Sequence, residues 1–163
     1  VGSARVTANS ATQPLAAVIN QTNNNKGFGS AYASFDPTKA TAKVSLPLVI
    51  DNNGRFKNFS GISIANVGAD PVNITCVYST QNGHTPAADS ETAVAPGAAM
   101  VRVHGGKLRK DDSTAYVGAA VCTATGTGET KIVGVVNQSP ALLVSSTGVA
   151  AGDGLLTYEG VNQ

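Results

Sequence analysis

The sequence predicts an all-β protein built as an antiparallel sandwich. Three observations predict this class: short runs rich in Val, Ile and Thr recur along the chain, turn residues separate them, and no segment has the apolar period of an amphipathic helix. Short strands at regular spacing between such turns are typical of two packed antiparallel sheets.

One strand is expected wherever such a run lies. The expected ranges are residues 2–8, 15–21, 31–35, 41–50, 59–67, 72–79, 91–94, 98–103, 115–124, 131–138, 142–145 and 155–159. Turns are expected between them, most clearly at residues 51–54, 81–83 and 95–97. There Asn and Gly supply positive φ angles, and Pro sets the first central position of the turn.

The charge balance excludes several classes of partner. Eleven basic and ten acidic residues leave a formal net charge of +1, so no global field attracts nucleic acid or an anionic membrane. No apolar run approaches the roughly 20 residues of a membrane helix, so membrane insertion is not expected. With 13% charged residues and many Ser, Thr, Asn and Gly, the composition is typical of a secreted β-protein. We therefore expect an extracellular or cell-surface location. The start at Val1, without Met or a leader, fits a mature product or an excised piece of a longer protein.

The two cysteines, Cys76 and Cys122, lie inside apolar, β-branched runs. Cysteines in neighbouring strands form a disulfide when their Cα atoms come within about 7 Å, and such bonds persist in oxidising compartments. We expect this bond; the alternative is a pair of buried free thiols. Neither cysteine has a second Cys or a His at metal-ligand spacing, so a metal site is not expected there.

An internal repeat divides the chain. Residues 1–8 reappear as residues 117–124 with five of eight positions identical, and residues 15–22 match residues 132–139, both ending in Asn-Gln-Ser/Thr. A weaker echo pairs residues 29–32 with 154–158. The period is about 117 residues, so we interpret residues 41–163 as a complete sandwich module and residues 1–40 as a partial copy.

The partial copy lacks the earlier strands of a module. A sandwich fragment of this kind exposes strand edges and apolar side chains, which aggregate unless they are covered. The segment either packs within its own chain or completes a neighbouring subunit, and the second arrangement repeated head to tail gives an open fibre. The interface candidates in this segment are Val1, Gly2, Val6, Leu15, Val18 and Ile19.

The stretch 107–112 is the one block of charge. Its charged members are Lys107, Arg109, Lys110, Asp111 and Asp112. The block is too short for a nucleic-acid patch and has no interleaved aromatic residues. A solvated loop is the first interpretation, and contact between copies, with opposite charges meeting, is the second.

The order of several short motifs resembles a module of large bacterial surface proteins. The motifs are VSLPLVI at residues 44–50, FSGISIANVG at 59–68, Tyr78, APG at 95–97, YVGAA at 116–120, VVN at 135–137 and YEG at 158–160. The resemblance implies an immunoglobulin-like sandwich that is repeated in tandem outside the cell and has no catalytic role. Phe56 stands where those modules usually have Trp, and the paired cysteines are not part of their pattern.

No catalytic constellation is expected. His84 and His104 are the two imidazoles, and both are expected in exposed loops; no nucleophile elbow, zinc-binding helix motif or phosphate-binding loop accompanies them. We therefore predict a protein that is not an enzyme and binds no cofactor.

The sequence also contains candidate calcium ligands and glycosylation sequons. Asp51 and Asn53 offer oxygens that Ca²⁺ prefers, but no acidic residue follows to complete a loop, so a turn is the favoured interpretation. Glycosylation sequons occur at Asn20, Asn58, Asn73 and Asn137.

These observations together predict a structural subunit of an extracellular bacterial filament or surface assembly. Its partners are copies of itself, joined head to tail by β-strand complementation (donor-strand exchange). The alternative is an adhesin-like sandwich that binds a carbohydrate or a surface. Glycan binding usually needs exposed aromatic platforms, and the chain has no Trp, four Tyr and four Phe.

Overall fold

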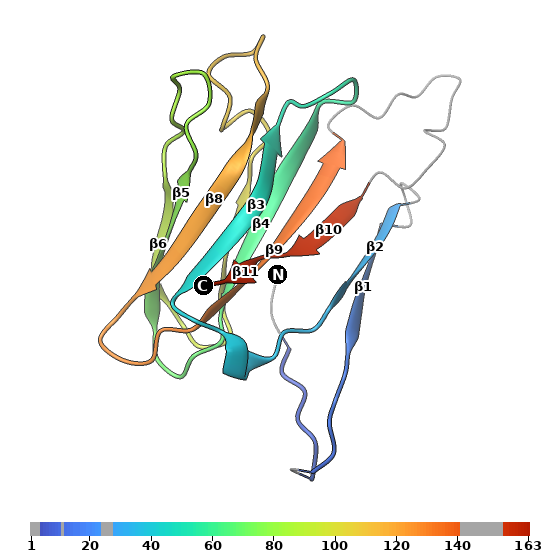
Figure 1. The fold of residues 1–163 in the computed structure, drawn as a ribbon, viewed down its shortest axis with the longest axis vertical. Coiled ribbons are helices and arrows are strands. Elements are labelled where there is room, and N and C mark those ends of the chain that lie inside the picture. Colours follow the sequence, from blue (N-terminus) through green and yellow to red (C-terminus); the bar gives the residue numbers. More distant parts are fainter. Residues whose placement is uncertain (1–3, 11, 24–27, 141–154) are drawn as a thin grey trace.

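The computed structural model describes residues 4–10, 12–23, 28–140 and 155–163, and their regular structure is almost entirely β (Figure 1). The strands are β1 (Val18–Asn23), β2 (Phe28–Ala33), β3 (Lys43–Asp51), β4 (Asn58–Asn66), β5 (Val72–Tyr78), β6 (Asp89–Val94), β7 (Ala99–Val103), β8 (Tyr116–Thr125), β9 (Ile132–Pro140), β10 (Leu156–Glu159) and β11 (Val161–Asn162). A 3₁₀ turn, η1 (Pro37–Lys39), joins β2 to β3. The predicted all-β class is confirmed.

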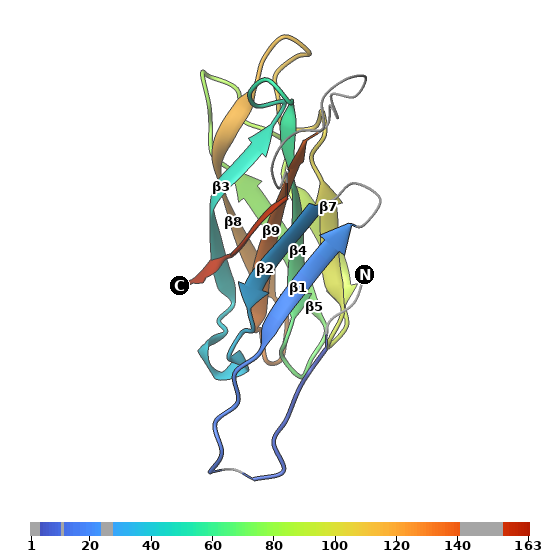
Figure 2. The same cartoon turned by 90° about the vertical axis from the view of Figure 1, so that its right-hand side faces the viewer.

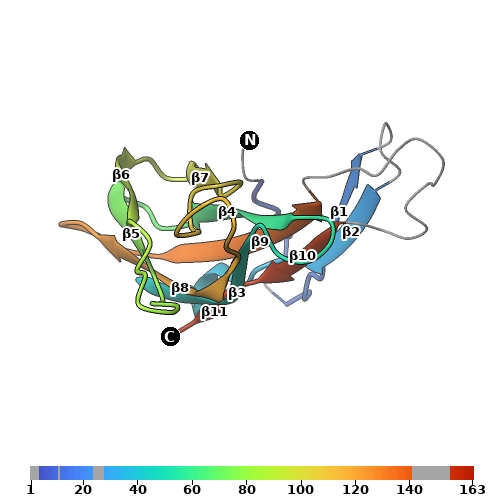
Figure 3. The same ribbon diagram turned by 90° about the horizontal axis from the view of Figure 1, so that it is seen from above.

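Two antiparallel sheets form the sandwich. One has four strands in the order β10-β9-β4-β7, and the other has five in the order β11-β3-β8-β5-β6. Seen from above, β4 and β7 lie on one side of the core and β3, β8 and β11 on the other (Figure 3). Strands β1 and β2 form a separate hairpin, which pairs with neither sheet in the described residues.

The order of strands differs from that of an immunoglobulin sandwich. If β3–β9 are matched in turn to the seven immunoglobulin strands, the central pairs β4–β7 and β5–β8 are the expected ones. The first, fourth and last strands lie in the other sheet, because β3 pairs with β8, β6 with β5 and β9 with β4. As a result β9 lies between β4 and β10, and this position matters for the interaction site.

The core follows from the alternation of side chains along each strand. In β5, residues 72, 74, 76 and 78 are buried while residues 73, 75 and 77 point outward. The buried cluster joins both sheets and includes Val44, Leu46, Ile62, Ile64, Ile74, Met100, Leu108, Tyr116, Ile132 and Val136. Each fully buried aliphatic side chain contributes roughly 1.5–3 kcal/mol, so this cluster is the main source of stability.

The expected strands agree with β3 to β10, and β11 was not expected. β1 and β2 are shifted by two or three residues from the expected ranges 15–21 and 31–35. At the N-terminus the expectation for residues 2–8 is wrong in its described part, because residues 4–8 form no strand. Their counterparts in the repeat, residues 120–124, lie in β8 between two partner strands, and residues 4–8 have none in the described chain. The strand expected at residues 142–145 lies outside the described residues.

Candidate interaction site

The N-terminal hairpin joins neither sheet of the sandwich in the described part of the chain. β1 and β2 pair from Val18 opposite Ala33 to Asn23 opposite Phe28, and β1 has no other ladder partner among the described residues. Figures 1 and 3 both place β2 beside β10. No ladder joins β2 to β10, although the Ala33 amide donates to Glu159 Oε1 at 2.8 Å. The outer edge of β1 therefore has no ladder partner among the described residues, and Figure 2 shows this strand facing the viewer.

The hairpin repeats the pairing of β9 with β10 residue for residue. Tyr158 lies opposite Val136, and the matching Tyr32 lies opposite Ile19. The neighbouring pairs agree as well: Thr157–Asn137 and Leu156–Gln138 in β10 and β9 correspond to Ala31–Asn20 and Ser30–Gln21 in the hairpin. The sequence repeat is thus matched by a shared ladder register in the two pairs of strands. A chance similarity between Ala- and Val-rich sequences would not produce this shared register.

The two copies differ sharply in burial. Val135 in β9 is 9% exposed, whereas its counterpart Val18 is 68% exposed. Ile132 is fully buried, whereas its counterpart Leu15 is 57% exposed. The segment that contains β1 therefore resembles β9 in sequence, but its apolar side chains are not packed into the core as those of β9 are.

The predicted interface residues of this segment fall into three groups. Val6, Leu15 and Val18 are exposed, with Val6 at 72%, and Ile19 is partly buried. Val1 and Gly2 lie outside the described residues. The exposed apolar side chains suit a contact surface, and their role in one remains a prediction.

The charged stretch forms a loop with internal partners. Arg109 Nη2 pairs with Asp112 Oδ1 at 2.7 Å, and Asp111 Oδ1 accepts from the Ser113 amide and hydroxyl. Lys107 and Lys110 are exposed. These contacts agree with a solvated loop; a contact between copies remains a prediction. Leu108 is buried in the core from the middle of this hydrophilic loop, and the sequence carries no signal for its burial.

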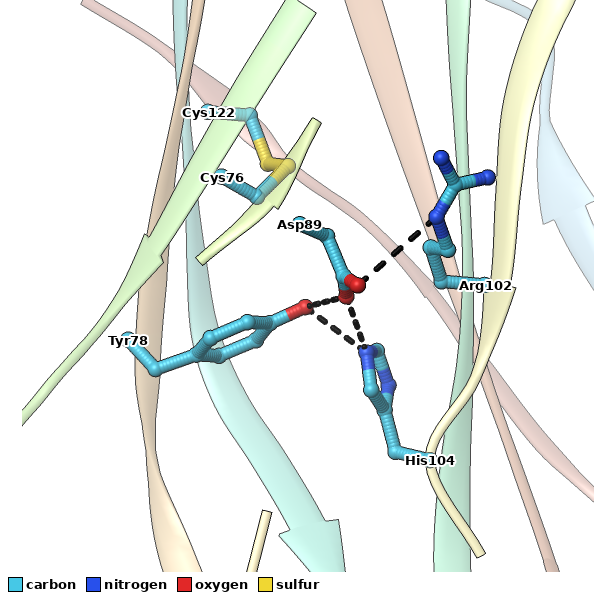
Figure 4. Close-up of a disulfide and its surroundings, with 6 residues drawn as sticks. All are labelled: Cys76, Tyr78, Asp89, Arg102, His104 and Cys122. Atoms are coloured by element: carbon cyan, nitrogen blue, oxygen red, sulfur yellow. Dashed lines mark hydrogen bonds and ion pairs between the residues drawn. A yellow bond between two sulfur atoms is a disulfide. The ribbon is translucent and has the colours of Figure 1, made fainter. Parts of the chain in front are cut away.

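A polar cluster, here called the polar clasp, consists of the buried Tyr78 and His104 and the partly buried Asp89 and Arg102 (Figure 4). The expectation of an exposed His104 is wrong, because this side chain is completely buried. The Tyr78 hydroxyl donates to Asp89 Oδ2 at 2.6 Å, and His104 Nε2 lies 2.9 Å from the same oxygen. Arg102 Nε lies 3.7 Å from Asp89 Oδ1.

The polar clasp links the two sheets at one edge of the sandwich. Asp89 belongs to β6, while Arg102 and His104 lie in and directly after β7 on the other sheet. Burial raises the pKa of Tyr78, and the nearby Asp89 carboxylate raises it further. Burial also acts to raise the pKa of Asp89, but hydrogen bonds from Tyr78 and His104 outweigh it and hold that pKa below its ordinary value. The Asp89 carboxylate is therefore the charged centre of the clasp.

The predicted disulfide is confirmed. Cys76 in β5 lies directly opposite Cys122 in β8 with a Cα–Cα distance of 3.9 Å, and the two sulfurs are bonded. Both residues are completely buried. The bond joins neighbouring strands of one sheet, whereas the immunoglobulin disulfide joins the two sheets. The alternative of free thiols is wrong.

Asp51 has a structural role that the sequence did not reveal. Its buried carboxylate accepts hydrogen bonds from the amides of Gly106, Leu108 and Arg109, at 2.8, 2.9 and 3.4 Å. These bonds hold the loop that follows β7. They occupy the carboxylate oxygens that would otherwise be available as Ca²⁺ ligands.

The segment that follows Asp51 forms the turn expected from the sequence. The amides and carbonyls of Asn53 and Asn58 bond each other in both directions, at 2.9 and 2.8 Å, and Gly54 has a φ of 68°. In the described ranges no group of three or more His, Cys, Asp or Glu side chains is arranged to hold a metal ion.

The four sequons lie in strands. Asn20 is exposed on β1, and Asn58 is partly buried at the start of β4. Asn73 Oδ1 accepts from the Ala93 amide at 2.9 Å, and Asn137 Oδ1 accepts from the Thr157 hydroxyl at 2.7 Å. Of the four, Asn20 and Asn73 are thus the exposed candidates for a glycan, and the glycosylation itself remains a prediction.

The fold and these sites define a disulfide-bonded β-sandwich that carries an extra, incompletely covered hairpin. No protein-family model matches the chain, and neither a curated protein nor a solved structure shows significant similarity to it. None of the described segments forms a helix of the length and apolarity needed to cross a membrane.

Proposed function

We propose that this protein is a structural subunit of an extracellular bacterial filament or surface assembly, in which strands of a neighbouring copy complete the N-terminal hairpin. One observation carries the proposal: the β1–β2 hairpin has the ladder register of β9–β10 but exposes the side chains that β9 buries. The order of motifs that resembles tandem modules of bacterial surface proteins supports the same function.

The edge of β1 and exposed apolar side chains in and before the hairpin favour contact with a second copy. Complete burial of a Val or Leu side chain is worth roughly 1.5–3 kcal/mol, and Val6, Leu15 and Val18 are all largely exposed. The unpaired edge of β1 offers amides and carbonyls for a further strand. Because the hairpin and the surface that covers it are different parts of the subunit, their contact is heterologous and can propagate as a fibre.

The covalent chemistry supports a location outside the cytosol. Disulfides persist in oxidising environments, and Cys76 and Cys122 are bonded in the core. Low charge and an extensive hydrogen-bonded sheet suit a protein that has to withstand that environment.

One observation favours the alternative, a carbohydrate- or surface-binding sandwich. Phe56 is exposed at the tip of the β3–β4 turn, and the Arg55 guanidinium lies 5.9 Å from its ring centre. An exposed ring of this kind can stack on a sugar face. A single ring is a small platform, so assembly remains the preferred function.

Electron microscopy of the full chain over a series of concentrations tests the proposal. We expect regular filaments or oligomers for the unaltered protein, and their loss when Leu15 and Val18 are both replaced by Ser. Val77→Ser is the matched control, because Val77 is 54% exposed on the outer face of β5 and away from the hairpin. A particle that stays monomeric at every concentration, particularly one that binds glycans, would overturn the proposal in favour of the alternative.

A further inference from the structure

The repeat identifies the surface that receives the hairpin. We infer that β1–β2 of one copy docks on β4 of a second copy, in the place that β9–β10 fill in the structure; this inference rests on the proposed assembly function. The place is called the β9 slot and consists of the β4 edge that pairs with β9 together with the backbone of Leu48 in β3.

The ladder register specifies the pairs that docking creates. In the structure, Asn137 lies opposite Gly61 and Val136 opposite Ile62. The hairpin counterparts of Asn137 and Val136 are Asn20 and Ile19, because both pairs of strands share one register. Docking therefore places Asn20 opposite Gly61 of the second copy and Ile19 opposite its Ile62.

The polar groups that seat β9–β10 are present in the hairpin. β3 changes register between Leu46 and Val49, which leaves the Leu48 backbone without ladder partners there. The Tyr158 hydroxyl contacts both the amide and the carbonyl of Leu48, and Gln138 Nε2 lies 3.5 Å from the same carbonyl. The hairpin has Tyr32 and Gln21 at the equivalent positions, so it carries the groups that would satisfy Leu48 in a second copy.

The apolar volumes also match. Residues 132–136 of β9 and residues 15–19 of the hairpin segment each contain thirteen side-chain carbons, although they are distributed differently. Ala17 replaces Gly134, where a Cβ would meet the side-chain tips of Ile64 and Leu46 at 3.1 Å; such contacts are tight but involve movable methyl groups. The two hairpins are therefore close to equivalent as occupants of one slot.

The match ends at a defined residue. Ser34 corresponds to Gly160, where a Cβ would lie 2.5 Å from Val44 Cγ2 and 2.9 Å from Leu46 Cδ2. A docked hairpin must therefore diverge from the path of β10 after Ala33, where β2 ends in the structure.

In an assembly, the resident β9 and the hairpin of a second copy compete for the β9 slot. β9 follows β8 through a short connection and so meets its slot at a high effective concentration. A hairpin from another copy reaches comparable occupancy only where copies are crowded together, as in an assembly. Exchange is expected to increase with protein concentration and with any change that weakens β9.

Disulfide trapping tests the register directly. A full-length copy with Asn20→Cys is mixed with one carrying Gly61→Cys, and the mixture is oxidised and analysed without reductant by electrophoresis and peptide mass spectrometry. A Cβ at Gly61 meets nothing closer than 3.7 Å, so the position accepts the new side chain. We expect a cross-link between residues 20 and 61 of different copies, with a yield that rises with concentration.

Two matched pairs control the trapping experiment. Asn137→Cys with Gly61→Cys in a single chain should close an internal bond, because these residues are opposed in β9 and β4. The second pair combines Thr22→Cys with Gly61→Cys; Thr22 lies on the same face of β1 as Asn20, two residues away. We expect its cross-link yield to be at least about tenfold lower than that of Asn20→Cys with Gly61→Cys. Equal yields from residues 20 and 22 would overturn the inferred register.

A second measurement does not depend on thiol geometry. Val136→Ala removes two carbons from the resident β9, which should raise exchange between copies by about tenfold, as measured by light scattering. Val94→Ala removes the same atoms from the core at β6, away from the slot, and should leave exchange unchanged. An identical response to both substitutions would overturn the inference.

The outcomes separate this inference from the proposed function. If the copies assemble but form no cross-link between residues 20 and 61, and Val136→Ala has no specific effect, the β9 slot is wrong while the assembly function stands. If no association occurs at any concentration, both fail.

Discussion

His104 and Asp89 lie on opposite sheets of the sandwich, and their side chains meet at 2.9 Å between Nε2 and Oδ2. Tyr78 donates to the same carboxylate oxygen, so one charge holds together strands from both sheets. The core is formed by apolar side chains, and this contact adds a polar connection at the β6–β7 edge.

The first prediction concerns the pH dependence of stability. The pKa of Asp89 is lower in the folded protein than in the unfolded chain, where the ordinary value is 3.8. The stabilisation by its ionised form is therefore complete above about pH 4 and is lost as the pH falls through the lower folded-state pKa. Asp89→Asn should lower the free energy of unfolding by about 1–3 kcal/mol at pH 7, with a smaller difference at pH 3.

Urea denaturation at both pH values measures this effect. Glu91→Gln is the control, because Glu91 contacts Arg102 from a more exposed position and should change stability by less than about 1 kcal/mol. A difference between the unaltered protein and Asp89→Asn that is the same at pH 3 and pH 7 would contradict the role assigned to Asp89.

The second prediction concerns the disulfide. The bond between Cys76 and Cys122 closes a loop with a sequence separation of 46 residues, for which chain entropy gives a stabilisation of about 4 kcal/mol. Replacing both cysteines by Ala should lower the denaturation midpoint accordingly. Reductant should destabilise the unaltered protein and leave the double variant unaffected; insensitivity of both would contradict the bond.

The third prediction separates a structural Asp51 from a calcium ligand. Asp51→Asn weakens three hydrogen bonds to the loop after β7 and should cost about 1–3 kcal/mol of stability. Adding Ca²⁺ at about millimolar concentration should leave the melting temperature of the unaltered protein unchanged. A rise that disappears in Asp51→Asn would show that the site binds calcium.

The fourth prediction compares two tyrosines at equivalent positions of the repeat. Tyr158→Phe removes the contacts to the Leu48 backbone and should destabilise the monomer by about 1 kcal/mol. Tyr32→Phe should leave the stability of the monomer unchanged and weaken association only. Equal destabilisation at low protein concentration, measured by chemical denaturation, would show that the hairpin already has a structural partner within its own chain.

Local patterns predicted the parts of the fold that depend on local chemistry. Alternation of Val and Ile with polar residues located β3–β9, and positive φ angles occur at Asn52, Gly54 and Gly83, where Asn-Gly turns were expected. The disulfide was predictable because each cysteine lies in a strand-like run.

The features that the sequence did not predict depend on contacts between residues far apart in the chain. His104 precedes two glycines and so resembles a loop residue. It is nevertheless buried, with its ring in contact with the carboxylate of Asp89, 15 positions away. Residues 4–8 have a strand-like sequence, but a strand requires a partner and the described chain supplies none there. Which sheet β3, β6 and β9 join depends on pairing over the whole chain and has no local signal.

Hydrogen exchange of the β1 amides at low and high protein concentration tests the central claim most directly. If a neighbouring copy completes the hairpin, amides within Val18–Asn23 should gain protection as the concentration rises. Those of β5, already paired on both sides in the monomer, should stay unchanged. Particles that grow with concentration while β1 exchanges at its monomer rate would contradict the claim that this hairpin is the point of assembly.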